Sequence, residues 1–159
     1  MSIKYKGIGI IKTPFKTKEG MPIQPCGAKG IQGTVLLKKK YNKGLSDLEG
    51  FSHIYLIYHL HKSKGYDLQV IPFLDTKPHG VFATRAPRRP NPIGISVVKL
   101  LNISGNLLSV ENVDMIDGTP LLDIKPYISQ FDRHDTEQNG WIKDIPDAMN
   151  EIWSDDRFN

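Results

Sequence analysis

The sequence has 159 residues, of which 39% are hydrophobic and 24% are charged, and its net charge at pH 7 is +4. A chain of this length and composition fits one folded domain, which excludes a wholly disordered protein. The single cysteine, Cys26, excludes an internal disulfide and a cysteine-rich metal site, and the longest apolar run, residues 54–60, is far shorter than the roughly 18 residues of a membrane span. We therefore expect a cytoplasmic protein with no membrane partner, whose positive charge is compatible with a nucleic-acid partner.

Short strands dominate the elements that the sequence predicts. Runs rich in β-branched and aromatic residues, bounded by turn residues, predict strands at residues 5–11, 33–37, 51–60, 68–73, 80–83, 94–101 and 107–113. This spacing predicts a mainly β fold, an antiparallel β-barrel with short helical segments, and the helices are too few for a doubly wound α/β fold. The helical segments are a turn at residues 45–50 and a short helix at residues 145–153. We expect a barrel domain over residues 1–135 and a C-terminal tail with a short helix over residues 136–159.

Residues 16–30 form a long loop rich in Lys, Pro and Gly. Compact domains rarely carry a loop of this length without a reason, and long loops of this kind often cover a ligand. We therefore expect this loop to border a binding site.

The segment GVFATRAPRRPNPIG, residues 80–94, is crowded with arginines and prolines. Prolines restrict the backbone at low entropic cost, so this segment can hold Arg85, Arg88 and Arg89 at fixed angles, as a binding site requires. The alternative is a stiff surface turn with solvated arginines, and composition alone favours that alternative.

A second patch, ENVDMIDGTPLLDIKPY at residues 111–127, is rich in carboxylates. Asp117 and Gly118, followed by Thr119 and Pro120, are good turn residues, so the simplest interpretation is a hairpin corner. Several aspartates together could also hold a metal ion, but neither a histidine nor the spacing of a calcium loop accompanies them, and we expect no metal.

Three histidines lie on or just after the apolar run at residues 51–60. Alternation places His53, His59 and His61 on one face of the predicted strand. Histidines in such positions usually pack in the core or bond to backbone, which we expect for His53 and His59. His61 ends the strand beside Lys62 and is the better candidate for a functional role.

Five segments occur in an order that resembles one known family. They are IGIIKTPF (residues 8–15), IQPCG (23–27), LEGFSHIYLIYHLHK (48–62), VFATRAPRRPNPIGIS (81–96) and DMIDGTPLLDIKPY (114–127). Over residues 8–132 the chain is similar to the TsaA family, also called TrmO-like proteins. Its members are S-adenosylmethionine-dependent transfer RNA methyltransferases of an unusual β-barrel type. Larger bacterial members carry an additional C-terminal segment, and this chain departs from them after the last motif.

The resemblance implies a barrel whose dimer builds a site for S-adenosyl-L-methionine, and methyl transfer to the exocyclic amine of a threonylcarbamoyl-modified adenosine just 3′ of the anticodon. The cofactor contacts that it implies by position are Gln24, Pro25, Cys26, His61, Lys62, Arg85, Ile95, Glu111, Asn112, Val113 and Asp114. Asp117, Asp123, Lys125 and Tyr127 are implied beside that site. Because the attacking amine must lose a proton, the catalytic candidates are Asp117, Lys125, Tyr127 and His61. Arg88 and Arg89 are candidates for contact with RNA phosphate.

Two other functions remain open at this point. The same barrel could be a non-catalytic module that senses S-adenosylmethionine or binds RNA, which would keep the cofactor contacts but methylate no RNA. An unrelated small basic barrel could bind RNA through its lysines, as oligonucleotide-binding folds do. The sequence lacks the row of aromatic residues on which bases stack, which counts against this last function.

Overall fold

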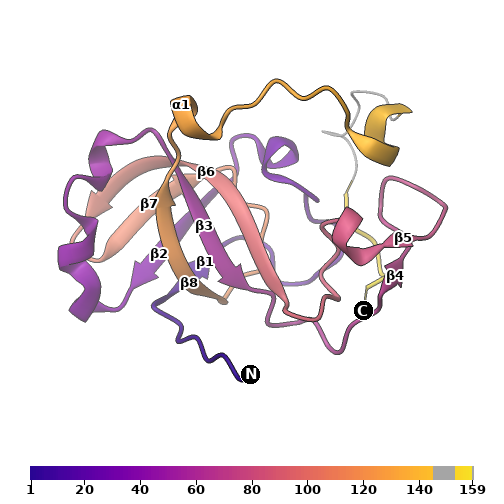
Figure 1. The fold of residues 1–159 in the computed structure, drawn as a ribbon. Helices are drawn as coiled ribbons and strands as arrows, with labels where there is room; N and C mark the ends of the chain where they lie inside the picture. The colour runs from indigo at the N-terminus through magenta and orange to yellow at the C-terminus, as the bar shows by residue number, and fades with distance from the viewer. Residues whose placement is uncertain (145–152, 159) are drawn as a thin grey trace.

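A barrel of six antiparallel strands forms the body of the structure, a computed structural model that describes residues 1–144 and 153–158 (Figure 1). The barrel strands are β1 (Gly9–Lys12), β2 (Gln32–Leu37), β3 (His53–His59), β6 (Ile93–Ser104), β7 (Leu107–Glu111) and β8 (Thr119–Pro126). A separate two-stranded sheet consists of β4 (Gln69–Val70) and β5 (His79–Gly80). The helices are short: α1 (Ser129–Asp132) and 3-10 helices at Pro25–Ala28, Lys39–Leu45, Leu48–Gly50, Val81–Ala83 and Gly140–Asp144. The predicted mainly β class is confirmed.

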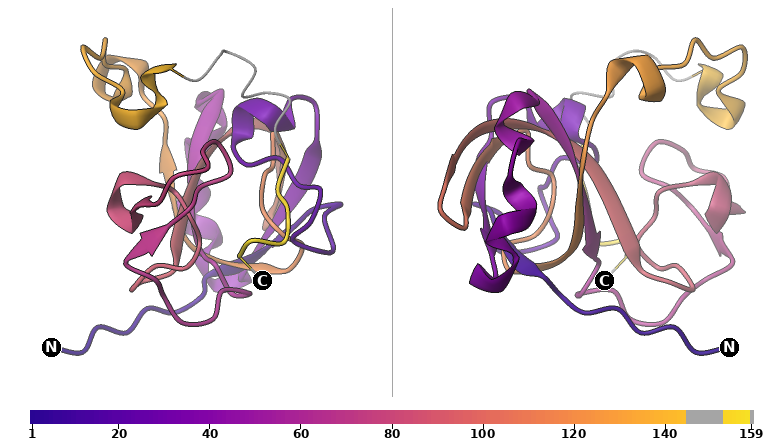
Figure 2. Two further views of the ribbon diagram at one scale, coloured as in Figure 1. Left: turned by 90° about the vertical axis from the view of Figure 1, so that its right-hand side faces the viewer. Right: turned by 60° about the vertical axis from the view of Figure 1, so that its left-hand side comes forward.

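The barrel closes in the order β1-β2-β7-β6-β3-β8, because β8 pairs with both β3 and β1. β6 and β7 form a hairpin whose turn contains Gly105 with a φ of 61°, a left-handed conformation that glycine adopts without strain. The β4–β5 sheet belongs to a small lobe, residues 68–86, which lies with residues 153–158 beside one end of the barrel (Figure 1). Figure 2 shows this small lobe turned toward the viewer, with the yellow C-terminal segment next to it.

Alternating burial along the strands places the core inside the barrel. In β3, Ile54, Leu56 and Tyr58 are buried while the residues between them are more exposed, as the two-residue period of a strand requires. Buried side chains of the other strands meet them, among them Ile11, Val35, Val98, Leu108, Val110 and Leu121. His53 and His59 therefore lie on the outer face of β3, so the expectation that they pack in the core is wrong, while a bond to backbone stays a prediction.

Two predicted strands are largely wrong. Residues 80–83 fold mostly as the 3-10 helix Val81–Ala83, and within residues 68–73 only Gln69–Val70 pairs as a strand. Both segments belong to the small lobe, where Val81 packs into a minor apolar cluster with Val70 and not onto a sheet. Their local composition favours strands. Their apolar side chains instead pack into this small cluster, whose members include residues far apart in the sequence and cannot be identified from a local pattern.

The strand β8 closes the barrel, but the sequence pattern does not predict it. Pro120 and Pro126 give the segment the look of a loop, because proline cannot donate a ladder hydrogen bond. They occupy its second and last positions, near the ends where strands tolerate proline. Gly118, with a φ of 80°, still makes the expected turn, and β8 begins directly after it.

The C-terminal tail is only partly described. The expected helix at residues 145–153 falls largely on residues 145–152, which lie outside the described part of the chain, and Trp153 forms an isolated β-bridge with Pro22. The domain boundary at residue 135 stays a prediction. Among the described residues, the helices are all too short or too polar to cross a membrane.

Replacing Leu121 with alanine tests the closing strand. Its side chain is fully buried in the barrel core, so Leu121→Ala should lower the free energy of unfolding by about 2–5 kcal/mol, the range for buried leucines. Leu101 on β6 is 41% exposed, so Leu101→Ala should cost less than about 1 kcal/mol. Urea denaturation measures both losses, and equal losses would show that β8 does not close the core.

Candidate functional site

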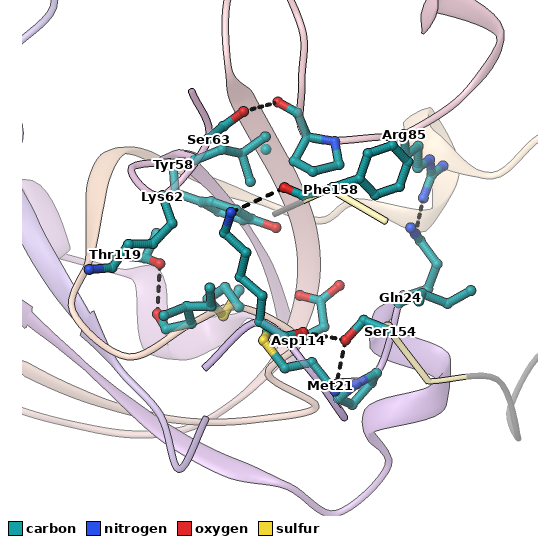
Figure 3. Close-up of a pocket in the computed structure, with 18 of the residues that line it drawn as sticks. Met21, Gln24, Tyr58, Lys62, Ser63, Arg85, Asp114, Thr119, Ser154 and Phe158 are labelled. Atoms are coloured by element: carbon teal, nitrogen blue, oxygen red, sulfur yellow. Dashed lines mark hydrogen bonds between the residues drawn. The ribbon is translucent and has the colours of Figure 1, made fainter. Parts of the chain in front are cut away.

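A cavity of about 300 Å³ lies where several segments meet at one end of the barrel (Figure 3). It is bounded by the long loop, the end of β3, the arginine–proline segment, the start of β6, the turn before β8 and the C-terminal residues. Its walls include Met21, Gln24, Tyr58, Lys62, Arg85, Asp114, Ser154 and Phe158. A second cavity of about 730 Å³ adjoins it, and Gln24 and Arg85 line both. The Arg85 guanidinium donates a hydrogen bond to the Gln24 side-chain carbonyl, so these two shared lining residues are joined to each other.

A chain of hydrogen bonds runs from the barrel interior to a carboxylate in the first cavity. The Ser96 hydroxyl donates to Asp114 over 2.6 Å, and the Tyr58 hydroxyl lies 2.9 Å from the Ser96 oxygen. Because Ser96 has only one proton and gives it to Asp114, Tyr58 is the donor to Ser96. The Asp114 carboxyl is thereby held in one orientation at the cavity wall.

Burial is the main cause of the pKa shifts of Asp114 and Tyr58, which are the two ends of this series of hydrogen bonds. It raises the pKa of the Asp114 carboxyl to about 6, although the hydrogen bond from Ser96 and the charge of Arg85 oppose the rise. Burial and then the nearby Asp114 charge raise the pKa of Tyr58 far above its usual range. At neutral pH the cavity therefore contains an ionised Asp114 and a protonated Tyr58.

The position of the Tyr58 ring depends on a glycine in the neighbouring strand. Tyr58 and Gly94 are directly paired between β3 and β6. A Cβ atom at Gly94 would lie 2.2 Å from the Tyr58 Cε2 atom, which is far inside van der Waals contact. The ring lies over the bare backbone at Gly94, and any other residue there would displace it.

Several cationic side chains border the same cavity as Asp114. Lys18, Lys62 and Arg85 all line it. Burial, followed by the charges of Lys64, Arg88 and Lys62, lowers the pKa of Lys18, which indicates a concentrated positive potential at this rim. The cavity thus presents a fixed carboxylate and a group of cations to the same ligand.

His61 lies in the same cavity, just beyond the end of β3. Burial lowers the pKa of its imidazole, and the nearby Lys62 and His59 lower it further. His61 is therefore mainly neutral at pH 7 and able to accept a proton.

The structure brings together most of the residues predicted to contact a cofactor. Gln24, His61, Lys62, Arg85, Ile95 and Asp114 line the first cavity, and Pro25 and Cys26 line the second. Glu111, Asn112 and Val113 line neither of these two cavities. Val113 is fully buried in the core, and the Asn112 side chain accepts a hydrogen bond from the Gly30 N–H over 3.1 Å. The burial of Val113 and the hydrogen bond of Asn112 hold the backbone that leads to Asp114.

Three of the four catalytic candidates lie away from both cavities. Asp117 accepts hydrogen bonds from the Thr13 N–H over 3.0 Å and from Lys16 over 2.6 Å, and the Lys16 bond is the main reason that the pKa of Asp117 is lowered. Lys125 forms an ion pair with Asp123 in β8, and the Tyr127 ring, just after β8, packs against the Tyr55 ring. Their catalytic role stays a prediction without support from this geometry, and His61 is the remaining candidate.

The two arginines expected to contact RNA are engaged within the protein. Arg89 donates to the backbone carbonyls of Val81, Thr84 and Ala86 and so holds the arginine–proline segment in shape. Arg88 forms an ion pair with Asp67 over 2.6 Å. Their contact with phosphate stays a prediction.

Sequence reasoning missed several residues of the cavity. Tyr58 and Ser96 belong to the quoted motifs, but only the register between β3 and β6 brings them to Asp114. Ser154, Asp155 and Phe158 come from the C-terminal end, and no pattern in the sequence places them at the cavity. Among the described residues, no three His, Cys, Asp or Glu side chains are grouped so that they could hold a metal ion.

Comparison with known families agrees with the motifs. The model of the tRNA-methyltransferase O N-terminal domain matches residues 10–133. The chain belongs to this family. The resemblance predicted from the five motifs is thereby confirmed, and the first cavity is built mainly from the matched residues of the tRNA-methyltransferase O domain.

Relatives in the tRNA-methyltransferase O family differ in length. A probable S-adenosyl-L-methionine-binding protein of Pyrococcus abyssi is 49% identical over 99% of this chain and 86% of its own length. The mouse tRNA (adenine(37)-N6)-methyltransferase is 39% identical, but the match covers 79% of this chain and only 31% of the mouse protein. The crystal structure of TrmO from Pseudomonas aeruginosa superimposes with a TM-score of 0.75 at 36% identity, over 89% of this chain and 63% of that chain.

Substitution of Gly94 tests the packing that supports Asp114. Gly94→Ala should lower the free energy of unfolding by about 1–3 kcal/mol, because the new methyl group collides with the Tyr58 ring. Gly80→Ala is the matched control, since a Cβ there meets no atom within 4 Å and should change stability by less than about 0.5 kcal/mol. Chemical denaturation compares the two, and a Gly94 variant as stable as the Gly80 variant would contradict this packing.

Proposed function

We propose that this protein transfers a methyl group from S-adenosylmethionine to the N6 amine of an adenosine in transfer RNA. The observation that carries the proposal is the cavity that the ionised Asp114 shares with Lys18, Lys62 and Arg85 in a tRNA-methyltransferase O domain. The names of the relatives support the same cofactor and the same type of RNA substrate.

The chemistry of the cavity fits S-adenosylmethionine. This cofactor has an adenine, a ribose diol, a sulfonium cation and an amino-acid end with both charges. Asp114 can balance a cationic group or accept hydrogen bonds from the ribose, and Arg85 can pair with the carboxylate. Ile95 and the other apolar side chains of the wall suit the faces of the adenine. The volume of about 300 Å³, extended by the adjoining cavity, lies within the range of small-molecule sites.

Catalysis in this site depends on alignment and on one proton transfer. When bound, the cofactor supplies an activated methyl group for in-line displacement, and the walls of the cavity hold it in place and limit water. The adenine amine must lose a proton during or after its attack. We assign acceptance of this proton to the neutral imidazole of His61, because Asp114 is engaged by Ser96 and by the cofactor.

The proposal extends to the modification state of the adenosine, the location of the protein and its assembly as a homodimer. Prior threonylcarbamoylation of the adenosine is supported by the family resemblance alone. A cytoplasmic location is supported by the single cysteine of the sequence. A homodimer is supported by apolar side chains at the groove, where Ile95 is 52% and Phe82 is 76% exposed. Contact with a second subunit or with transfer RNA would remove these side chains from water.

A non-catalytic S-adenosylmethionine-binding module is the second candidate function. The relative from Pyrococcus abyssi, which the chain matches over nearly its whole length, is named for binding alone. Binding without turnover on any transfer RNA would favour this candidate.

Methyl transfer to transfer RNA from a strain that lacks this activity tests the proposal. With labelled S-adenosylmethionine, the label should appear in N6-methylated adenosine next to the anticodon. Arg85→Ala should reduce the rate by about tenfold or more, the scale of one lost charged hydrogen bond, and should leave the melting temperature within a few degrees. Arg133→Ala, an exposed arginine outside both cavities, is the control.

Two results would contradict the proposal. Label in another nucleoside or in the protein itself would exclude adenosine methylation. An Arg85 variant that methylates as fast as the Arg133 variant would exclude the first cavity as the site.

The pH dependence of cofactor affinity tests the role of Asp114. Protonation removes its charge, so a cationic ligand should bind about tenfold more weakly at pH 5 than at pH 7, given a pKa of about 6 in the free protein. Asp114→Asn should bind weakly at both values. His61→Gln should keep the pH dependence, which separates Asp114 from the imidazole in the same cavity. Calorimetry at both pH values provides the measurement, and equal affinity of the parental protein would refute the assignment.

A further inference from the structure

The C-terminal strap, which we define as residues 153–158, borders the first cavity from outside the matched family domain. The family model ends at residue 133, so the strap is a feature beyond the shared barrel. Ser154, Asp155 and Phe158 of the strap line the first cavity, in which Figure 3 labels Ser154 and Phe158, and Phe158 also lines the second cavity. The strap is therefore a wall of the groove and not a loose end on the surface.

One end of the strap is fastened to the long loop. The Ser154 N–H donates to the Met21 carbonyl over 2.7 Å, and the Ser154 carbonyl accepts from the Gly20 N–H over 3.0 Å. The Ser154 hydroxyl accepts from the Met21 N–H over 2.9 Å and donates to the Lys18 carbonyl. All the polar groups of Ser154 are thus used to hold the loop that forms one side of the cavity.

The other end of the strap is anchored in the small lobe. The Phe158 side chain is 8% exposed and packs with Val70, Val81 and Ala86, in edge-to-face contact with Phe73 at a centroid distance of 5.2 Å. Its carbonyl accepts a hydrogen bond from the Lys18 ammonium over 3.1 Å. The strap therefore joins the loop and the lobe, which lie on different sides of the cavity.

Between these anchors, charged groups of the strap are fixed against each other. Arg157 binds both carboxylate oxygens of Asp155 and donates to the Pro72 carbonyl over 2.6 Å. The bond from Arg157 is the main cause of the lowered pKa of Asp155, so this cavity-lining carboxylate stays ionised at neutral pH. The arrangement orders the strap without any contribution from a ligand.

We propose that the C-terminal strap is part of the cofactor site and retains S-adenosylmethionine in the first cavity. Phe158 and Ser154 are positioning residues that hold the loop and the lobe together over the bound ligand. The ligand leaves when the strap detaches, so the strength of these anchors sets its rate of release. This inference rests on the proposed function, because it takes S-adenosylmethionine as the occupant of the cavity.

The rate of cofactor release from full-length variants tests the strap. Phe158→Ala removes the aromatic anchor, and dissociation of S-adenosylmethionine should become at least about tenfold faster. Phe158→Leu keeps an apolar anchor and should restore most of the retention. Asp156→Asn changes an exposed strap residue that lines neither cavity and should release the cofactor at the parental rate. Stopped-flow displacement measures the rates, and thermal unfolding checks that each variant is folded.

The possible outcomes separate failure of the proposed role of the strap from failure of the proposed function. A parental protein that binds no S-adenosylmethionine contradicts the proposed function itself. A parental protein that binds it, together with a folded Phe158→Ala variant that releases it at the parental rate or binds it more tightly, overturns the role of the strap. If Phe158→Ala does not fold, Ser154→Ala decides in its place: faster release supports the strap, and unchanged release refutes it.

Discussion

A carboxylate held inside the protein is the constraint on which the cavity depends. Burying the ionised Asp114 costs free energy, and the Ser96 hydroxyl and the Arg85 charge offset that cost only in part, so the pKa of Asp114 remains raised. Ser96 also accepts a hydrogen bond from the Tyr58 hydroxyl, and the Tyr58 ring requires the bare backbone of Gly94. A cationic group of a ligand beside Asp114 would supply the missing compensation.

Closure of the barrel brings the parts of this site together. Pairing of β3 with β6 places Tyr58 beside Gly94, while the chain between β7 and β8 carries Asp114 to the same end of the barrel. The loop at residues 16–30 and the arginine–proline segment then form the outer walls, joined through Gln24 and Arg85. The strap adds a wall from the far end of the sequence. The functional side chains thus come from separate local segments, and the strand register of the barrel brings them together.

Much of the fold follows from the sequence, but the closing contacts do not. Runs rich in β-branched and aromatic residues predict β3, β6 and β7, because these predictions depend only on local pattern. β8 was missed because Pro120 and Pro126 obscure a strand whose partners are distant in sequence. In the site, Asp114 and Asp117 have the same chemistry three residues apart, and only the three-dimensional structure separates the cavity carboxylate from the one that secures the turn to Thr13.

A crystal structure of the protein with S-adenosylmethionine bound tests this account most directly. The ligand should lie in the first cavity beneath the strap, with a cationic or ribose group against the Asp114 carboxylate and its own carboxylate near Arg85. A ligand bound elsewhere on the barrel, or one that makes no contact with Asp114, would contradict it.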